Sequence, residues 1–422
     1  MSFLDCGAWR RAGLMALLLW QMPAVADPAL TLAEAEEVAL ARDGGLDQLR
    51  ARRDALGDAA IAEAELPDPQ LRFGAMNVPT DSFDLDQEPM TQVQVGLRQR
   101  FQPGKTRSIA RERGEVLATV QEARSQDRER GVRQAVRRAW IEHAWTSGAV
   151  GLLAEQQIWF AQLDDAAMAA YASGRRPQHE LLRIAMEREL LDERQVELRQ
   201  MALTSRAALS RWLGSDGVPA AITELPTLPD PGPPAIGVER VAAHPAVVAA
   251  RREADASALQ VDLARQRYRP GWAVDVAYGF RDGEDADGDD RADFLSAMLS
   301  FDVPLFTGNR QDRRVSSAAA EERGRRARLT EVQRELLASY EAATARWESL
   351  ADRIEVFETR VVPSAEANVV ATRQAYRNDV VPFDELVGAE KALLEARTRL
   401  LRLRTDRLLA QSDMLYLAGE RP

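Results

Sequence analysis

The sequence has little cysteine and little histidine, and these shortages exclude several kinds of site. Only Lys105 and Lys391 are lysines, a scarcity from which we draw no functional conclusion. The one cysteine, Cys6, lies in an N-terminal segment where Arg10 and Arg11 precede a short apolar run. Small residues at Ala24–Ala26 offer a cleavage point, so we predict a secretory signal peptide over residues 1–26. Because Cys6 precedes the apolar run, we expect no lipid anchor. The mature chain then has no thiol for a disulfide, a nucleophile or a metal ligand.

The chain also lacks an excess of basic residues. It has 55 Lys and Arg against 66 Asp and Glu, a formal net charge of −11. A nucleic-acid partner requires a basic surface, so we expect none. Charged residues make up 29% and aromatic residues only 6%, a balance that suits long amphipathic helices. After the signal no segment approaches 18 consecutive apolar residues. If the exported chain enters a membrane, we expect it to do so through β-strands.

The sequence does contain an internal duplication. Tyr171 and Tyr376 stand in similar contexts, as do Pro177 and Pro382, at a nearly constant offset of about 205 residues. Between the copies, six prolines within residues 218–235 exclude a helix or a central strand. We therefore predict two repeats, residues 27–217 and 236–422, joined by a Pro-rich linker at residues 218–235.

Each repeat has the pattern of one helix, two strands, a very long helix and a return helix. We expect the first helices over 31–65 and 238–266, the long helices over 105–172 and 309–375, and the return helices over 178–213 and 383–417. At 1.5 Å per residue, the long helices reach about 100 Å. In the last helix Leu394, Leu401, Leu408 and Leu415 recur at every seventh residue, which indicates coiled-coil packing.

Four short segments alternate between apolar and polar residues. In "GWAVDVAYGF", Trp272, Val274 and Val276 alternate with Ala273 and Asp275. The same pattern occurs in "TQVQVGLRQRF" and "FLSAMLSFDVPLF", and more weakly in "PQLRFGAMNV". Such segments are typical of outer-membrane barrels, although an ordinary half-buried sheet has the same alternation. Four strands cannot close a barrel in lipid, so we expect several copies of the chain to combine.

Two short motifs resemble known sites but are incomplete. The segment "HELLR" lacks the second histidine of a zinc-protease helix, because Arg183 stands in its place. The segment "PGKTR" lacks the first glycine of a phosphate-binding loop. We expect Gly104 and Gly308 to form the turns that lead from strand to helix. We therefore predict no catalytic residue, no metal site and no cofactor.

The segment "RDGEDADGDDRAD", residues 281–293, resembles a calcium loop but lacks the closing glutamate. It lies between two predicted strands, as does "TDSFDLDQE" in the first repeat. A solvated loop is the favoured interpretation, and weak attraction of cations at a channel mouth is the alternative.

With these elements, nearly the whole mature chain resembles the TolC family of outer-membrane channel-tunnels. Residues 66–92, "LPDPQLRFGAMNVPTDSFDLDQEPMTQ", are similar to its heavy-metal branch. The resemblance implies an α+β membrane protein that forms a homotrimer. Four β-strands per chain would contribute to a twelve-stranded outer-membrane barrel, above a long coiled-coil α-helical tunnel in the periplasm. Several relatives carry a lipid-modified N-terminal cysteine, which this mature chain lacks.

The resemblance also implies a function and partners. The protein would be a passive exit duct in the outer membrane of a Gram-negative bacterium, not an enzyme. It would export heavy-metal cations together with a periplasmic adaptor protein and an inner-membrane RND-type pump, with outer-membrane lipid around its barrel. The same fold also serves organic-drug efflux and type I protein secretion, which the sequence separates poorly. A periplasmic coiled-coil scaffold is a remoter alternative, because a scaffold would not need two strand pairs.

The segments "YASG" and "YRND" mark the tips where the resemblance places the periplasmic gate. We expect the gate's hydrogen bonds or salt bridges to come from Tyr376, Arg377, Asp379 and Asp384. Repeated around a threefold axis, Asp379 or Asp384 would form an acidic ring that favours cations, unless both are simply solvated. We expect contacts with the adaptor protein at Tyr171, Ala172, Ser173, Gly174, Asn378, Val380 and Val381.

Overall fold

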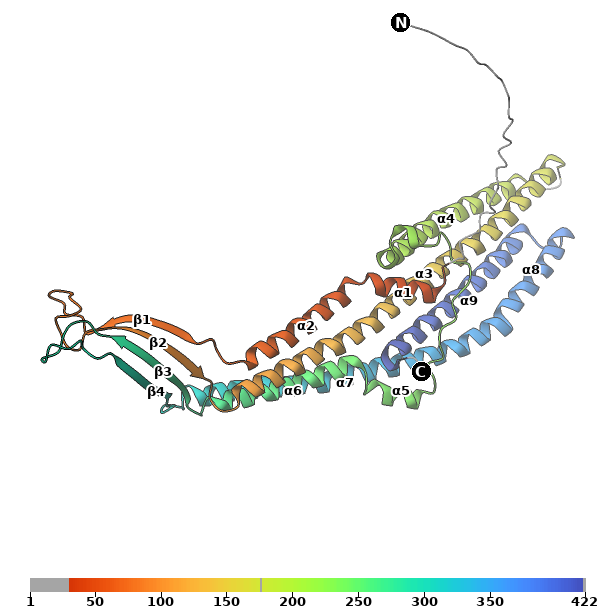
Figure 1. Ribbon diagram of the computed structural model, residues 1–422. Helices are drawn as coiled ribbons and strands as arrows, with labels where there is room; N and C mark the ends of the chain where they lie inside the picture. The colour runs from red at the N-terminus through yellow and green to blue at the C-terminus, as the bar shows by residue number, and fades with distance from the viewer. Residues whose placement is uncertain (1–29, 175–176, 420–422) are drawn as a thin grey trace, which may run out of the picture.

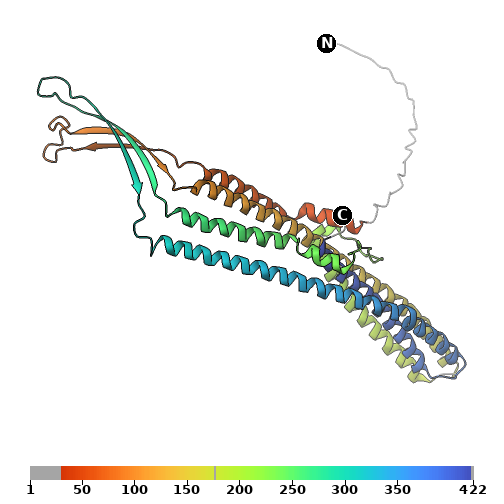
Figure 2. The ribbon, with the colours of Figure 1, turned by 90° about the horizontal axis from the view of Figure 1, so that it is seen from below.

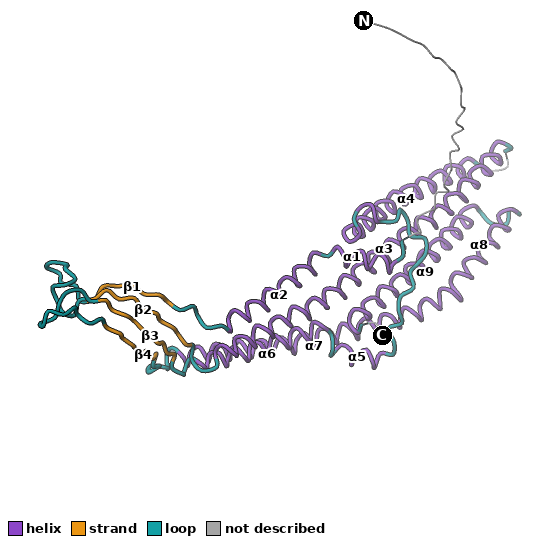
Figure 3. Tube along the Cα trace, in the orientation of Figure 1, coloured by secondary structure: helices purple, strands orange, loops and turns teal. Residues whose placement is uncertain are grey.

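The computed structural model of the chain describes residues 30–174 and 177–419 and shows an elongated molecule (Figure 1). Four strands form one end, and long helices extend from them to two tips at the other end. Beyond the sheet, helices make up most of the molecule (Figure 3). The predicted signal peptide, residues 1–26, lies outside the described residues. Within those residues, no helix is long and apolar enough to cross a membrane.

An order of two helices, two strands and a long helical hairpin occurs twice along the chain. The first series is α1 (Leu32–Arg42), α2 (Gly44–Ala64), β1 (Gln70–Met76), β2 (Gln92–Phe101), α3 (Thr106–Ala172) and α4 (Gln178–Leu213). The second is α5 (Pro234–Val241), α6 (Pro245–Gln266), β3 (Gly271–Phe280), β4 (Phe294–Asp302), α7 (Gln311–Val356), α8 (Val362–Arg377) and α9 (Phe383–Ala418). The observed bounds of α3, α4 and α9 lie within a residue of those predicted.

Two predicted helices are each divided in the structure. The expectation of one helix over 31–65 is wrong at Asp43, whose carboxylate accepts a hydrogen bond from the Leu46 amide at 2.9 Å and so caps α2. The same carboxylate pairs with Arg128 of α3 at 2.7 Å. The helix expected over 238–266 is divided at His244, which caps α6 ahead of Pro245. A single capping side chain fixes each break, which apolar periodicity does not reveal.

The long helix predicted over 309–375 is interrupted by a π-helical segment, Phe357–Val361, between α7 and α8. Pro363 explains the interruption. Proline has no amide hydrogen to donate to the carbonyl of Thr359, and its ring crowds that carbonyl, so the helix widens there. The corresponding part of α3 has no such interruption, and α3 continues for 67 residues.

The connection between the repeats has no helix or strand from Val218 to Pro233, and α5 begins just before the predicted end of the linker at residue 235. Polar contacts hold this segment against the helices. The Nε2 atom of His143 lies 3.2 Å from the carbonyl of Pro219, and Gln411 donates to the carbonyl of Pro229 at 2.8 Å.

The four strands form one antiparallel sheet in the order β1-β2-β3-β4, which confirms the predicted number of strands. The register pairs Leu97 with Val276, and Arg98 with Asp275. Side chains therefore sort into an apolar and a mostly polar face, as the alternation predicts. Exposed residues of the apolar face are Leu71, Phe73, Leu97, Trp272, Val276, Phe280, Leu295, Leu299 and Phe301.

The helices run side by side along the molecule (Figure 2). Helix α3 contacts α2, α4, α6 and α9, whereas α7 packs on α6 and α9, and α8 packs on α9. Successive clusters of buried apolar side chains lie along the bundle. One joins Val120 of α3 to Ala249 of α6, and another joins Leu153 of α3 to Leu198 of α4. The core is thus a long, thin series of clusters, which matches the low aromatic content and the coiled-coil periodicity.

Candidate gate at the helix tips

Two helical hairpins end in tight turns at the end of the molecule remote from the sheet (Figure 1). One turn follows α3 and the other follows α8. Among the described residues, Gly174 in the first turn has φ +69° and Asp379 in the second has φ +58°, both in the left-handed backbone region. These two residues occupy equivalent places in "YASG" and "YRND". Aspartate tolerates this region better than most residues, so the turn itself gives Asp379 a structural role.

Two of the four predicted gate residues contact the other hairpin. The hydroxyl of Tyr376 donates to a carboxylate oxygen of Glu180 on α4 at 3.4 Å. A carboxylate oxygen of Asp384 on α9 lies 2.8 Å from a guanidinium nitrogen of Arg183 on α4. Arg377 and Asp379 are exposed at the end of α8 and in the following turn. The structure thus places two polar links between hairpins and two charged side chains at their outer end.

The residues predicted to meet an adaptor protein lie at the two turns. Most are exposed; Val380 has 73% of its surface accessible and Tyr171 has 42%. The exposed group comprises Tyr171, Ala172, Ser173, Gly174, Asn378 and Val380, and Val381 is half-buried. Their exposure leaves most of them available for contact with another protein.

Sequence reasoning missed the apolar contacts beneath these links. Phe383 at the start of α9 is buried against Ile184 of α4 and Phe160 of α3, in one cluster. Tyr376 packs at the edge of this cluster, with its ring centroid 6.1 Å from that of Phe383. The only signal in the sequence was the position of Phe383 directly after Pro382. The duplication gave no sign that this residue is buried.

Sequence reasoning also missed a third polar link, between Glu187 of α4 and Lys391 of α9. Their charged atoms are 3.0 Å apart. A groove of about 620 Å³ surrounds the pair, lined by residues of α3, α4 and α9 that include Leu190, Leu191 and Leu394. The one signal available in the sequence was the scarcity of lysine, which makes Lys391 unusual.

The predicted strand-to-helix turns differ from each other. Gly104 has φ +55°, and a Cβ atom there would lie 2.5 Å from side-chain atoms of Gln266 and Arg269, so this turn requires glycine. Gly308 lies in a turn outside the left-handed region, with open space around it. The backbone amide of Lys105 donates to Gln266 at 3.0 Å, which fixes the start of α3.

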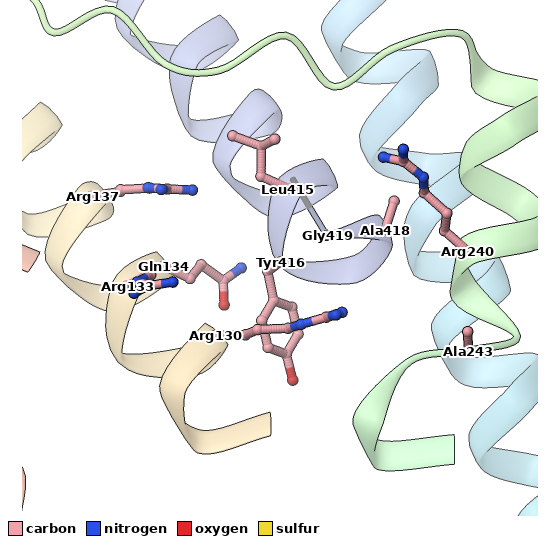
Figure 4. Close-up of a pocket in the computed structure, with 10 residues that line it drawn as sticks. All are labelled: Arg130, Arg133, Gln134, Arg137, Arg240, Ala243, Leu415, Tyr416, Ala418 and Gly419. Carbon is pink, nitrogen blue, oxygen red and sulfur yellow. The ribbon is translucent and has the colours of Figure 1, made fainter. Parts of the chain in front are cut away.

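A second cavity, of about 520 Å³, lies where α3 meets α9 and the end of α5 (Figure 4). Arg130, Arg133 and Arg137 reach it from α3, and Arg240 reaches it from α5. Arg137 is paired with Glu36 at 2.7 Å, and Arg133 lies 3.2 Å from Glu37. Carboxylates of α1 thus already engage two of its arginines.

The acidic segment between β3 and β4 has its own hydrogen bonds. A carboxylate oxygen of Asp285 accepts from the amides of Asp287 and Asp289, at 2.9 and 3.1 Å. The guanidinium of Arg291 donates to the carbonyls of Glu284 and Asp86, at 2.9 and 2.8 Å, and so joins this loop to the one between β1 and β2. Across residues 30–174 and 177–419, no cluster of three or more His, Cys, Asp or Glu is placed to hold a metal ion.

Solved structures similar to this chain include outer-membrane proteins and channels. The outer membrane protein VceC of Vibrio cholerae superimposes with a TM-score of 0.77 at 19% identity, over 92% of this chain and 96% of that one. CusC, described in terms of transmembrane channel formation, gives 0.76 at 15% identity, over 93% and 92%. The open-state MtrE outer membrane channel of Neisseria gonorrhoeae gives 0.75 at 14% identity, over 92% and 89%. The chain has the fold of these channels.

Residues 239–420, most of the second repeat, also match the family model described as outer membrane efflux protein. None of the curated proteins compared with the chain matches it.

Proposed function

We propose that the protein is a passive exit duct of an efflux system in the outer membrane of a Gram-negative bacterium. Three chains would combine their sheets into a twelve-stranded barrel in the membrane. Their helices would form a water-filled tunnel through the periplasm. The one observation that carries this proposal is the sheet itself, which exposes an apolar face and leaves β1 and β4 as unpaired edges within one chain. In lipid such edges require partner strands, and further copies of the chain supply them.

The tips would form the periplasmic gate and meet the adaptor protein of an inner-membrane RND-type pump. The links of Tyr376 with Glu180 and of Asp384 with Arg183 support a closed arrangement of the two hairpins. Asp379 is exposed, so three copies could face one another around the axis as an acidic ring. We expect Asp379→Lys to shift the reversal potential away from cation selectivity. An unchanged reversal potential would mean that Asp379 does not form an acidic ring.

The cargo we propose is heavy-metal cations, on the resemblance of residues 66–92 to the heavy-metal branch. The pump supplies the energy. It also selects the metal, because the mature chain has no cysteine and only three histidines to serve as metal ligands. A strain lacking the gene should become sensitive to divalent metals. Sensitivity to organic drugs alone would support drug efflux through the same duct instead.

The first experiment is location and mass together. Outer and inner membranes are separated by density, the protein is extracted in mild detergent, and its mass is determined by light scattering. We expect an outer-membrane particle of three chains that conducts ions in planar bilayers. A soluble monomer from the periplasm would contradict the duct and favour the scaffold.

A further inference from the structure

The contact between Glu187 and Lys391 lies deeper in the bundle than the two links at the tip. The side chain of Glu187 is 11% exposed and that of Lys391 is 46% exposed. Arg183 and Asp384, at the tip, are 48% and 52% exposed. The carboxylate of Glu187 is sheltered from solvent and salt, whereas both charges of the tip pair are exposed, so the deeper pair contributes more to holding its two helices together.

The three links follow the periodicity of the helices. Glu180 and Glu187 are separated by seven residues on α4, and Asp384 and Lys391 are separated by seven residues on α9. A step of seven returns to the same face of a helix, so the links form one row along the seam between the hairpins. Glu187 lies about 14 Å along α4 from its first residue. The row therefore extends the polar contact well inside the tip.

The groove beside Glu187 and Lys391 makes each of these two charges depend on the other. Ala149, Leu153, Leu191, Leu198 and Leu394 supply much of the apolar part of its lining, and Arg194, Glu395, Thr398 and Arg399 supply the rest of its polar part. If the hairpins parted, the carboxylate of Glu187 would lose its ammonium partner beside these apolar side chains, which is unfavourable. Lysine suits such a span, because its flexible aliphatic stem packs on apolar surface while its ammonium reaches the carboxylate.

We propose that Glu187 and Lys391 are positioning residues of the gate, which hold the α3–α4 hairpin against the α8–α9 hairpin inside the tip. Opening then requires this pair to separate, in addition to the links of Tyr376 and Asp384. The inference rests on the proposed function, because it assumes a channel that opens at its tips.

The test measures ion conduction by the full-length protein in planar bilayers. We expect Glu187→Gln and Lys391→Met each to raise the open fraction about tenfold, because each removes the attraction between the sheltered carboxylate and the ammonium. The exchanged double variant, Glu187→Lys with Lys391→Glu, should restore the closed state. A purely structural role predicts no such rescue.

The matched control is Arg188→Gln. Arg188 pairs with Asp164 of α3, so both partners belong to one hairpin, and their separation is not needed for opening. We expect this variant to conduct like the wild type. The mass of each variant in detergent shows whether it still assembles.

The outcomes separate the two proposals. A wild-type protein that forms no channel would overturn the proposed function. A wild-type channel whose Glu187 and Lys391 variants assemble and stay closed would overturn this inference alone. Equal opening by both single variants and the exchanged variant would also overturn it, because the cause would then be packing rather than charge.

Discussion

At the scale of single residues, the buried imidazole of His244 makes the helical section sensitive to acid. Its Nδ1 atom accepts from the Ala246 amide, and its Nε2 atom lies 3.2 Å from the carbonyl of Tyr416, so the ring is held neutral. Burial lowers the pKa of His244, an effect that the carboxylate of Asp127 opposes and the charge of Arg130 reinforces. Unfolding therefore takes up a proton below about pH 6.5, and stability falls as the pH drops from there toward the lowered pKa.

We expect the wild type to lose up to about 1.4 kcal/mol per pH unit through this residue across that window. In His244→Asn, the side chain still caps α6 but does not titrate. That variant should be about 1 kcal/mol less stable at pH 7.5, because the bond to Tyr416 is lost, and should lose less stability on acidification. Thermal unfolding by circular dichroism at pH 7.5 and 5.5 measures both effects. His143, buried in the same section, is common to both proteins. Parallel losses in the two proteins would contradict the assignment.

Residues at the tips show how far sequence reasoning extends at this scale. The duplication located Tyr376 and Asp384, because both lie in or next to the repeated pattern of a tyrosine, a turn and a proline. It did not locate Glu180, Glu187 or Lys391 as their partners and neighbours. Which face of α4 meets α9 depends on how two hairpins pack, and residues far apart in sequence determine that packing.

At the scale of elements, the sheet carries a charge cluster that spans three strands. Asp275 of β3 lies 2.8 Å from Arg72 of β1 and 3.6 Å from Arg98 of β2, on the mostly polar face. In the proposed barrel this face lines the lumen. Asp275→Asn would leave two guanidinium groups there without their carboxylate, and we expect the anion-to-cation permeability ratio to rise about twofold at 0.1 M salt.

Reversal potentials in a salt gradient measure this change. Asp275→Glu retains the charge and should behave like the wild type. The difference should shrink at 1 M salt, where charges are screened within about 3 Å. If both variants give the same reversal potential at low salt, the polar face does not line the conducting path.

The sequence predicted the elements themselves better than their interruptions. Period-two alternation gave all four strands, and the heptads gave α9 nearly to the residue. The breaks at Asp43 and His244 were missed, because each cap depends on a single side chain that accepts a nearby amide hydrogen, which apolar periodicity does not reveal. The π-helical segment before Pro363 was missed although the proline was visible, because a proline in a long helix also permits a simple kink.

At the scale of the whole molecule, α4 presents an apolar stripe that one chain leaves exposed. Leu182, Val196 and Leu203 lie at multiples of seven residues on one face and are 64%, 65% and 67% exposed. In the proposed trimer a neighbouring chain would cover this stripe, and burial stabilises by about 1.5–3 kcal/mol per large aliphatic side chain.

We expect Val196→Glu to dissociate the three-chain particle in detergent at concentrations where the wild type remains assembled, as measured by light scattering. Thr204→Glu adds the same charge at an already polar, exposed position about a quarter-turn around α4 from the stripe, and should leave the mass unchanged. A Val196→Glu protein that keeps the mass of three chains would mean that this stripe faces solvent or the tunnel, and that the chains meet through other helices.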